Sequence, residues 1–301
     1  MDTLDLHITH LQGFMQDTKT ATLYESWWDD TTVNHWRHTR LMSPVLEVLA
    51  DLKDFRWLTI GDGAGMDAWR LINAGFANTA ASDLSDAVLK ETHQRGYIKS
   101  FHAINAEKID LPDESFDFVL CKETLHHMSS PYSAIQECLR IAKFAVVMIE
   151  PQDPMIDNPV DPSNDKPGYE EVGNYVYTFS KREIQKIAYG LNFLGVATKG
   201  QTDAYIPGCE FAHCVPDDEI WNQTQQIIQT HENYIAQGLS KASYVQAIIF
   251  KQAIGEDIFN TLSNAFPAWQ FVRTDTNPYL WITMVRKADG LKPVSWSELT
   301  K

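Results

Sequence analysis

Residues 57–67, which read W-L-T-I-G-D-G-A-G-M-D, decide the fold of this chain. Apolar and β-branched residues run directly into Gly61, Gly63 and Gly65, and the stretch from Asp67 onward has helical character. This order predicts a buried strand, a tight turn and a helix start. Glycines in such a turn permit positive φ angles, and the free N–H groups of the helix start attract a ligand. We therefore expect a small molecule to bind at this turn.

The spacing of the glycines narrows the identity of that molecule. A dinucleotide-binding turn has glycines at its first, third and sixth positions, and here the sixth position is Met66, which disfavours an NAD-dependent oxidoreductase. Glycines at positions one, three and five resemble the first motif of the class I S-adenosylmethionine (SAM) methyltransferases. That motif carries an acid two places before its first glycine, and this chain has Thr59 there.

Composition excludes several classes of partner. The 301 residues allow one large domain or a core with a smaller cap. Twenty-five Lys and Arg against 40 Asp and Glu give a net charge of −15, which disfavours binding to nucleic acid or to an acidic membrane surface. The four cysteines suit free thiols in a reducing compartment, and no window approaches the roughly 20 apolar residues of a membrane span. We expect a cytoplasmic protein that acts on a small molecule.

Alternating strands and helices predict a doubly wound α/β sheet. Strands are expected to begin near residues 57, 79, 101, 116 and 144, with helices between them. The second strand ends at Asp83, about 20 residues beyond the glycine turn, where an acid accepts hydrogen bonds from the two hydroxyls of a ribose. A helix-capping role for Asp83 is the alternative interpretation.

A second motif makes the resemblance specific. Residues 113–128 read D-E-S-F-D-F-V-L-C-K-E-T-L-H-H-M, and Pro131 follows. They closely resemble the fourth motif of the same SAM-dependent family, and in particular its type 11-like methyltransferase domain. The resemblance implies a seven-stranded Rossmann-like sheet of order 3-2-1-4-5-7-6 and SAM as the cofactor. It also implies the cofactor-binding set Gly61, Asp62, Gly63, Gly65, Asp83, Leu84, Asn105, Ala106, Glu107, Lys122 and Glu123.

The segment before the first strand is aromatic. Trp28 lies among further tryptophans there, and the simpler interpretation is that these rings pack a helix onto the core. The alternative is that residues 1–50 fold over the cofactor, as the resemblance implies. Arg40 would then pair with the methionine carboxylate of SAM, and Trp28 would contact the substrate.

Transfer to a hydroxyl requires a base. The sulfonium methyl of SAM is already electrophilic, so the protein must chiefly align the acceptor and remove its proton. His127, His126 and Glu150 are the candidate catalytic residues, although a His-His pair at a helix start also serves packing or capping.

The acceptor is expected on the carboxyl-terminal side of the fifth strand. Residues 151–175 read as a long loop, and Asn174, Tyr175 and Tyr177 offer rings with polar tips for an uncharged, hydroxyl-bearing molecule. Helices are predicted over 216–238 and 241–266, and a last strand over 280–285. The expected domains are a helical cover at 1–50, a SAM-binding core at 51–200, a helical cap at 201–270 and a final strand and tail at 271–301.

The function predicted is O-methylation of a sugar or secondary metabolite. A non-catalytic SAM- or nucleotide-binding module, and an N- or C-methyltransferase acting on a metabolite or peptide, stay open as alternatives, as does a homodimer. We expect no metal, because Cys209, His213 and Cys214 lack a second pair of ligands at zinc spacing.

Overall fold

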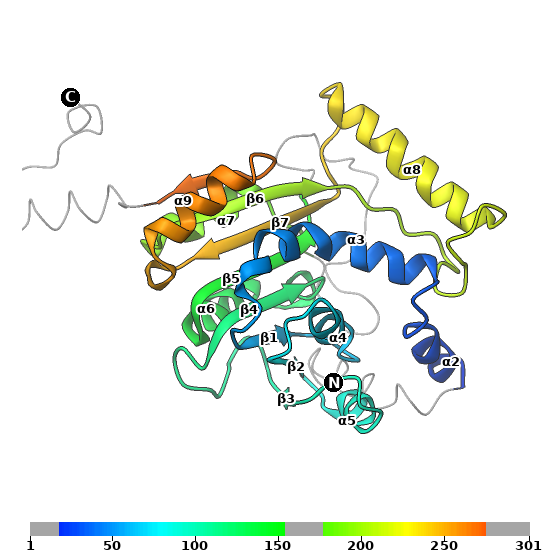
Figure 1. Cartoon of the computed structure of the whole chain (residues 1–301), viewed down its shortest axis with the longest axis horizontal. Helices are drawn as coiled ribbons and strands as arrows, with labels where there is room; N and C mark the ends of the chain where they lie inside the picture. Colours follow the sequence, from blue (N-terminus) through cyan, green and yellow to red (C-terminus); the bar gives the residue numbers. More distant parts are fainter. Residues whose placement is uncertain (1–17, 154–176, 275–301) are drawn as a thin grey trace, which may run out of the picture.

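One mixed β-sheet organises the molecule (Figure 1). The computed structural model describes residues 18–153 and 177–274, and within them eight strands lie in the order β3-β2-β1-β4-β5-β7-β6-β8. The strands are β1 (Trp57–Ile60), β2 (Thr79–Asp83), β3 (Phe101–Ala103), β4 (Phe116–Lys122), β5 (Ala142–Pro151), β6 (Gly195–Gln201), β7 (Tyr244–Phe250) and β8 (Gln270–Arg273).

The first five strands are parallel and the last three antiparallel to their neighbours. Leu58 of β1 pairs with Val119 of β4, which in turn pairs with Val146 of β5. All three side chains are fully buried, because helices cover both faces of the sheet. Burial on both faces explains why these strands read as unbroken apolar runs rather than as alternating ones.

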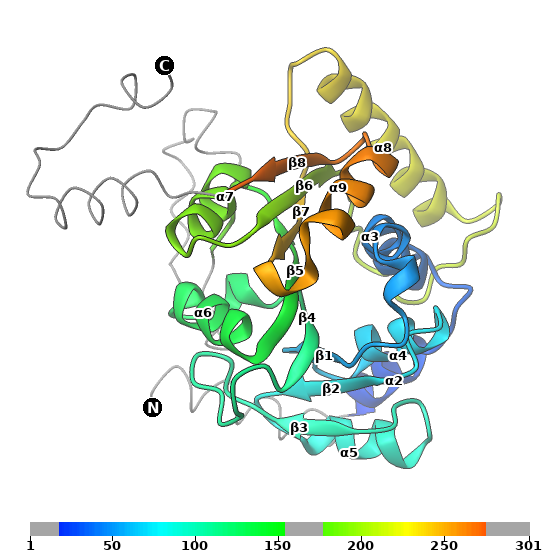
Figure 2. The same cartoon turned by 60° about the vertical axis from the view of Figure 1, so that its left-hand side comes forward.

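Helices form a layer on each face of the sheet (Figure 2). Apolar residues of α3, α4 and α9 pack on one face, and those of α6 and α7 on the other. The α-helices are α2 (Thr18–Ser26), α3 (Val33–Val48), α4 (Met66–Asn73), α5 (Ala87–Gln94), α6 (Pro131–Ile141), α7 (Lys181–Gly190), α8 (Glu219–Ala236) and α9 (Glu256–Ala265). Short 3-10 turns are η2 (Ala50–Leu52), η3 (Leu125–His127) and η4 (Gln252–Ile254).

The predicted fold class is confirmed, with one strand more than expected. The first seven strands have the order 3-2-1-4-5-7-6, and β8 adds an eighth at the edge of β6. The strand predicted over 280–285 lies outside the described residues. In the described sheet, β7 lies between β5 and β6, and its residues pair with both of these strands.

The helix predicted over 241–266 is therefore wrong in its first part. Residues 245–250 are all buried in the sheet, and only α9 at the end of the range is an α-helix. A short apolar run such as V-Q-A-I-I-F suits a buried strand as well as a helix, and pairing with β5 and β6 decides between them. The predicted cap at 201–270 consequently cannot include β7, β8 or α9.

The helix predicted over 216–238 is present as α8. This helix buries only Thr224 and Ile228, and it projects from the body of the molecule (Figure 1). Among residues 18–153 and 177–274, no helix has the length and apolar character needed to cross a membrane.

Candidate active site

The turn after β1 has the backbone that its glycines predict. Gly61, Gly63 and Gly65 have φ angles of 64°, 55° and 82°, which favour glycine. A Cβ atom on Gly61 would lie 1.8 Å from the hydroxyl oxygen of Thr124, so no side chain fits there. A Cβ on Gly63 would meet no atom within 4 Å. The backbone at Gly63 therefore borders open space, as a ligand-binding turn requires.

The Asp62 side chain holds this turn from within, and the place of Asp62 in the cofactor-binding set stays a prediction. Its carboxylate accepts hydrogen bonds from the Thr59 hydroxyl (2.7 Å) and from the N–H groups of Asp67 and Ala68 at the start of α4 (2.8 and 2.9 Å). Burial, together with repulsion from Asp67, raises the pKa of Asp62 to about 7. Thr59 stands where the family has an acid, and its hydroxyl binds the Asp62 carboxylate. Asp62 in turn caps α4, because the N-cap residue Gly65 has no side chain to do so.

Asp83 at the end of β2 faces the same turn. One carboxylate oxygen accepts a hydrogen bond from the Gly63 N–H at 2.8 Å, and the other lies 3.4 Å from the Ser85 N–H. The side chain is buried, and Leu84 beside it is half-buried. The structure therefore brings the strand-end acid to the glycine turn, and ribose binding by Asp83 stays a prediction.

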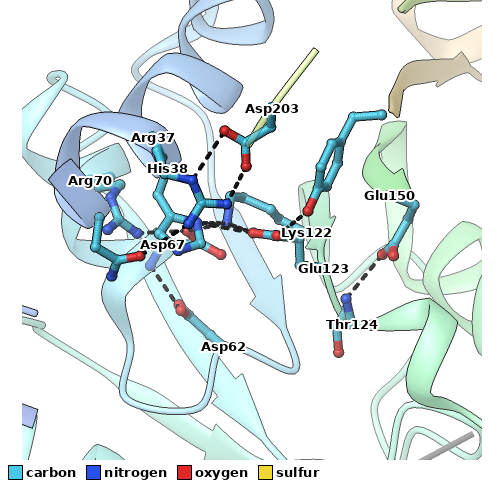
Figure 3. Close-up of polar contacts among 12 residues, drawn as sticks. Arg37, His38, Asp62, Asp67, Arg70, Lys122, Glu123, Thr124, Glu150 and Asp203 are labelled. Atoms are coloured by element: carbon cyan, nitrogen blue, oxygen red, sulfur yellow. Dashed lines mark hydrogen bonds and ion pairs between the residues drawn. The ribbon is translucent and has the colours of Figure 1, made fainter. Parts of the chain in front are cut away.

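Lys122 and Glu123 lie at the end of β4 in a network of charges (Figure 3). The Lys122 ammonium lies 2.6 Å from the Glu123 carboxylate, 2.9 Å from Nδ1 of His38 and 3.6 Å from the Asp67 carboxylate. The Tyr244 hydroxyl donates to the other oxygen of Glu123 at 2.7 Å. Glu123 also has a left-handed φ of 50°, an unusual conformation for a residue with a side chain.

Mutual attraction stabilises the charged forms of this network. Burial disfavours the Lys122 ammonium, but Asp67 and Glu123 outweigh that effect and raise its pKa. Burial likewise disfavours the Glu123 carboxylate, yet the charges of Lys122 and His38 hold the pKa of Glu123 well below its ordinary value. Burial and the Lys122 charge lower the pKa of His38. Because Lys122 and Glu123 are engaged with each other, a ligand at this place meets a nearly neutral ion pair.

Arg40, predicted to pair with the SAM carboxylate, is engaged elsewhere. Its guanidinium donates to the Thr202 carbonyl and lies 2.7 Å from the Glu232 carboxylate of α8. The neighbouring Arg37 points instead toward the network, where it forms a buried two-point ion pair with Asp203 (Figure 3). Residues three apart lie on the same face of a helix, so the two arginines differ in partner because Arg40 lies one turn nearer the carboxyl end of α3, and pairing of Arg40 with the SAM carboxylate stays a prediction.

Glu150 is an orienting residue rather than an accessible base. Its side chain is fully buried, and one oxygen accepts hydrogen bonds from the N–H groups of Thr124 (3.1 Å) and Leu125 (3.0 Å). The other oxygen lies 2.7 Å from Nδ1 of His126. An ionised carboxylate can only accept, so Nδ1 of His126 is the donor and its Nε2 carries the lone pair. Its burial leaves no exposed oxygen in this structure, and a catalytic role for Glu150 stays a prediction.

His127 lies beside this pair. Its ring centroid is 3.9 Å from that of His126, and its backbone N–H donates to the Thr124 carbonyl at 3.1 Å. Tyr177 lies at the same turn, since its backbone N–H donates to the His126 carbonyl at 3.0 Å. Its side-chain hydroxyl donates to Glu183 of α7. Asn174 and Tyr175 lie outside the described residues.

The loop after β3 forms an internal turn. The Asn105 side-chain oxygen accepts a hydrogen bond from the Glu107 N–H at 2.9 Å, and the Glu107 carboxylate accepts one from the Ser130 N–H at 2.7 Å. Ala106 between them is buried. These contacts order the loop, and contact with an adenine stays a prediction.

Trp28 packs against aromatic residues, as the simpler interpretation of the tryptophans holds. Its ring stacks on Tyr97 at 4.0 Å and meets Trp69 and Tyr24 edge-on. Tyr24 belongs to the same apolar cluster as Ala64 of the glycine turn. The amino-terminal segment therefore covers the outside of this turn, and the prediction of substrate contact by Trp28 gains no support.

Several site residues could not be found from the sequence. His38, Asp67, Arg37, Asp203 and Tyr244 come from α3, α4, the segment after β6, and β7, and only the fold brings them to the end of β4 (Figure 3). No motif links these residues. The basic run H-W-R-H-T-R at 35–40, which contains Arg37 and His38, is the one sequence feature that could have pointed to two of them. In the described ranges, no three His, Cys, Asp or Glu side chains come together as a metal site.

The fold and the glycine turn define a doubly wound nucleotide-cofactor protein, and comparison with known proteins identifies the family. Residues 58–148 match the family model described as a methyltransferase domain. They form a class I SAM-dependent methyltransferase domain, whose cofactor is SAM.

The curated relatives match only part of the chain. A 27-O-demethylrifamycin SV methyltransferase of Amycolatopsis mediterranei is 27% identical over 40% of this chain and 47% of its own length. A ubiquinone biosynthesis O-methyltransferase of Methylococcus capsulatus is 29% identical over 48% of this chain and 60% of its own. The chain thus spans about half the length of these relatives. A solved SAM-dependent methyltransferase of Thermotoga maritima, described as a possible histamine N-methyltransferase, has 19% identity and a TM-score of 0.49 over 81% of this chain and all of its own.

Proposed function

We propose that this protein transfers the methyl group of SAM to a hydroxyl of a small molecule, with His126 as the general base. The observation that carries the proposal is the His126–Glu150 pair at the end of β4 and β5. The relatives that match residues of this domain include O-methyltransferases of small molecules, which supports the same class of reaction here.

The residues around the glycine turn fit SAM. Gly63 leaves bare backbone beside open space, and the Asp83 carboxylate lies at the same turn. Asp83 would hold the ribose hydroxyls and the turn would hold the methionine part. When bound, SAM supplies an electrophilic methyl group on a sulfonium, so the protein has chiefly to orient the acceptor and take its proton.

His126 takes that proton at Nε2. Its Nδ1–H is fixed by Glu150, which keeps the ring in one orientation and favours the imidazolium that forms when the hydroxyl is deprotonated. The His126 side chain is 14% exposed, enough to meet a substrate, while that of Glu150 is fully buried. His126 is therefore the catalytic residue in this proposal, and Glu150 positions it.

The test compares two adjacent histidines. With radiolabelled SAM and a panel of phenols and sugars, His126→Ala is expected to lower kcat by about 10² or more, while the dissociation constant for SAM changes by no more than a few-fold. His127→Ala is the matched control and should keep most of the activity. Glu150→Gln should shift the pH dependence of kcat, which a purely structural role would leave unchanged.

The opposite pattern would contradict this assignment. If His127→Ala abolishes transfer and His126→Ala does not, then the base is His127. If the wild-type protein binds SAM by calorimetry but methylates no member of the panel or of a metabolite extract, the chain is a SAM-binding module and the proposed activity fails.

A further inference from the structure

A cavity of about 540 Å³ lies where β6 ends, α8 ends and α7 begins. It is separate from the charge network, and its wall includes four basic side chains, one acid and two amides: Arg40, Lys181, Lys199, Lys241, Glu232, Gln152 and Gln201. β8 pairs with β6 only as far as Thr198, so within the described chain no strand covers the outer side of Lys199–Gln201. The cavity is therefore open to a small molecule.

The charge of this cavity is opposite to that of the chain. The protein carries a net charge of −15, yet among the described residues of the cavity wall the one acid is Glu232, which pairs with Arg40 at 2.7 Å. Lys181 and Lys199 have no carboxylate within ion-pair distance among the residues the structure describes. Burial and repulsion from Lys241 lower the pKa of Lys181, as expected for a cation that lacks a counterion. An anion in the cavity would supply that counterion.

Polar groups converge over bare backbone at one wall of the cavity. A Cβ atom on Gly200 would lie 3.5 Å from the Lys181 ammonium and 3.6 Å from the Gln152 side-chain oxygen, so both side chains end above Gly200. That oxygen of Gln152 is buried and accepts no hydrogen bond within the described part of the chain. A ligand with both an anionic group and a hydroxyl would satisfy Lys181 and Gln152 together.

The cavity wall and the proposed base are linked through the end of β5. Gln152 follows Glu150 by two residues, or about 7 Å along an extended chain, and Glu150 holds His126. One small molecule could therefore place an acidic group among the lysines while its hydroxyl reaches His126.

We propose that this cavity binds a carboxylate or phosphate group of the methyl acceptor, so that the substrate is a hydroxylated small-molecule anion. The acceptor part of this inference rests on the proposed methyl transfer, whereas anion binding does not. It departs from the expectation of an uncharged acceptor, which was based on aromatic rings with polar tips. Lys181, Lys199 and Lys241 are far apart in the chain and meet only in the fold.

Anion binding is tested directly by calorimetric titration with inorganic phosphate and, in a second arm, with citrate. The double variant Lys181→Gln with Lys199→Gln removes two charges from the cavity. Lys186→Gln with Lys108→Gln is the matched control, since both lysines are exposed and lie outside the cavity. We expect the cavity variant to weaken binding of the preferred anion at least tenfold and the control variant less than twofold. The anion that binds the wild-type protein more tightly shows whether the cavity prefers a phosphate or a carboxylate.

Two results would overturn the binding site: an equal loss in both double variants, or no saturable binding of either anion by the wild-type protein. The acceptor role is tested with radiolabelled SAM and a metabolite extract separated by anion exchange, in which label is expected in the anionic fraction. Label confined to the neutral fraction would reject the anionic acceptor and leave methyl transfer intact. Saturable anion binding without label in any fraction would leave the site intact and reject methyl transfer.

Discussion

The half of the sheet from β1 to β5 and the half formed by β6, β7 and β8 differ in how their charges are compensated. In the first half, Asp62 caps α4 and Lys122 meets Glu123 within a few residues of chain. In the second half, Lys181 and Lys199 face a cavity in which the one acid is paired with Arg40. The buried charges of the first half are thus compensated mainly by near neighbours in the chain, whereas Lys181 and Lys199 in the second half have no carboxylate within ion-pair distance among the described residues.

The largest expected effect is at the glycine turn of the first half. Gly61→Ala would place a Cβ 1.8 Å from the Thr124 hydroxyl and 2.8 Å from its Cβ, on a backbone with φ of 64°. We expect a loss of about 4 kcal/mol or more in the free energy of unfolding, since the turn must open to admit the atom. Urea denaturation followed by circular dichroism measures it.

Gly96→Ala is the matched control for that change. Gly96 has a similar φ of 80°, but a Cβ there would meet no atom within 4 Å. Its cost should be that of backbone strain alone, about 1 kcal/mol. Equal losses for the two variants would show that φ, and not the approach of Thr124, makes Gly61 necessary.

The next effect tests the internal compensation of charge. Glu123→Gln leaves the buried Lys122 ammonium without its nearest carboxylate, and we expect a loss of about 3 kcal/mol at pH 7. Because the pKa of Glu123 is lower in the folded protein, its contribution is fully present above its ordinary pKa of about 4.3 and is lost as pH falls through the folded value. The difference between variant and wild type should therefore shrink below about pH 4.

Glu25→Gln provides the comparison for that measurement. Glu25 pairs with Arg95 at the surface, where solvent screens the pair, so its removal should change stability far less at every pH. A loss for Glu123→Gln that does not diminish on acidification would mean that packing, rather than charge, is responsible.

A smaller effect is expected in cofactor binding. If the Asp83 carboxylate accepts hydrogen bonds from the ribose, Asp83→Ala should weaken SAM binding by about 2 kcal/mol, as measured by calorimetry on folded protein. Asp86→Ala, which removes an acid three residues later, should leave affinity nearly unchanged. An unaltered dissociation constant for Asp83→Ala would reject the ribose assignment and leave Asp83 as a residue that only holds Gly63.

The smallest effect concerns a local helix cap in the second half. The Ser180 hydroxyl accepts from the Glu183 N–H, and the Glu183 carboxylate accepts from the Ser180 N–H, which forms a capping box at the start of α7. Ser180→Ala should cost about 1 kcal/mol of stability. Ser130→Ala at the start of α6 is the control, because the Ser130 hydroxyl bonds to the Ser133 hydroxyl (2.6 Å) and caps no backbone N–H of the helix. Equal losses would show that the box contributes nothing specific.

The sequence predicted the first half well because its signals are local. Strand, glycine turn and helix follow one another within residues 57–73, and the acid at the end of β2 follows at the expected interval. Residues 180–183 read S-K-R-E, and a Ser followed three residues later by Glu is likewise the pattern of a capping box. Such features depend on backbone preferences and short-range hydrogen bonds, which a linear pattern retains.

The second half shows what a linear pattern cannot retain. Nothing in V-Q-A-I-I-F excludes a helix, and β7 is a strand because β5 and β6 offer unpaired backbone on both of its sides. Glu150 read as a free strand-end acid, yet it is buried against the turn that carries His126.

The sequence by itself determined the first five strands and the position of the glycine turn, because period, length and turn chemistry are properties of neighbouring residues, whereas the sheet order was implied only by the family resemblance. Only the tertiary structure decided which charges compensate one another: Lys122 lies with Glu123 and Asp67, and Arg37 with Asp203, while Lys181 and Lys199 have no carboxylate within ion-pair distance among the described residues. Electrostatic energy depends on distance in space and on burial, and the fold sets both.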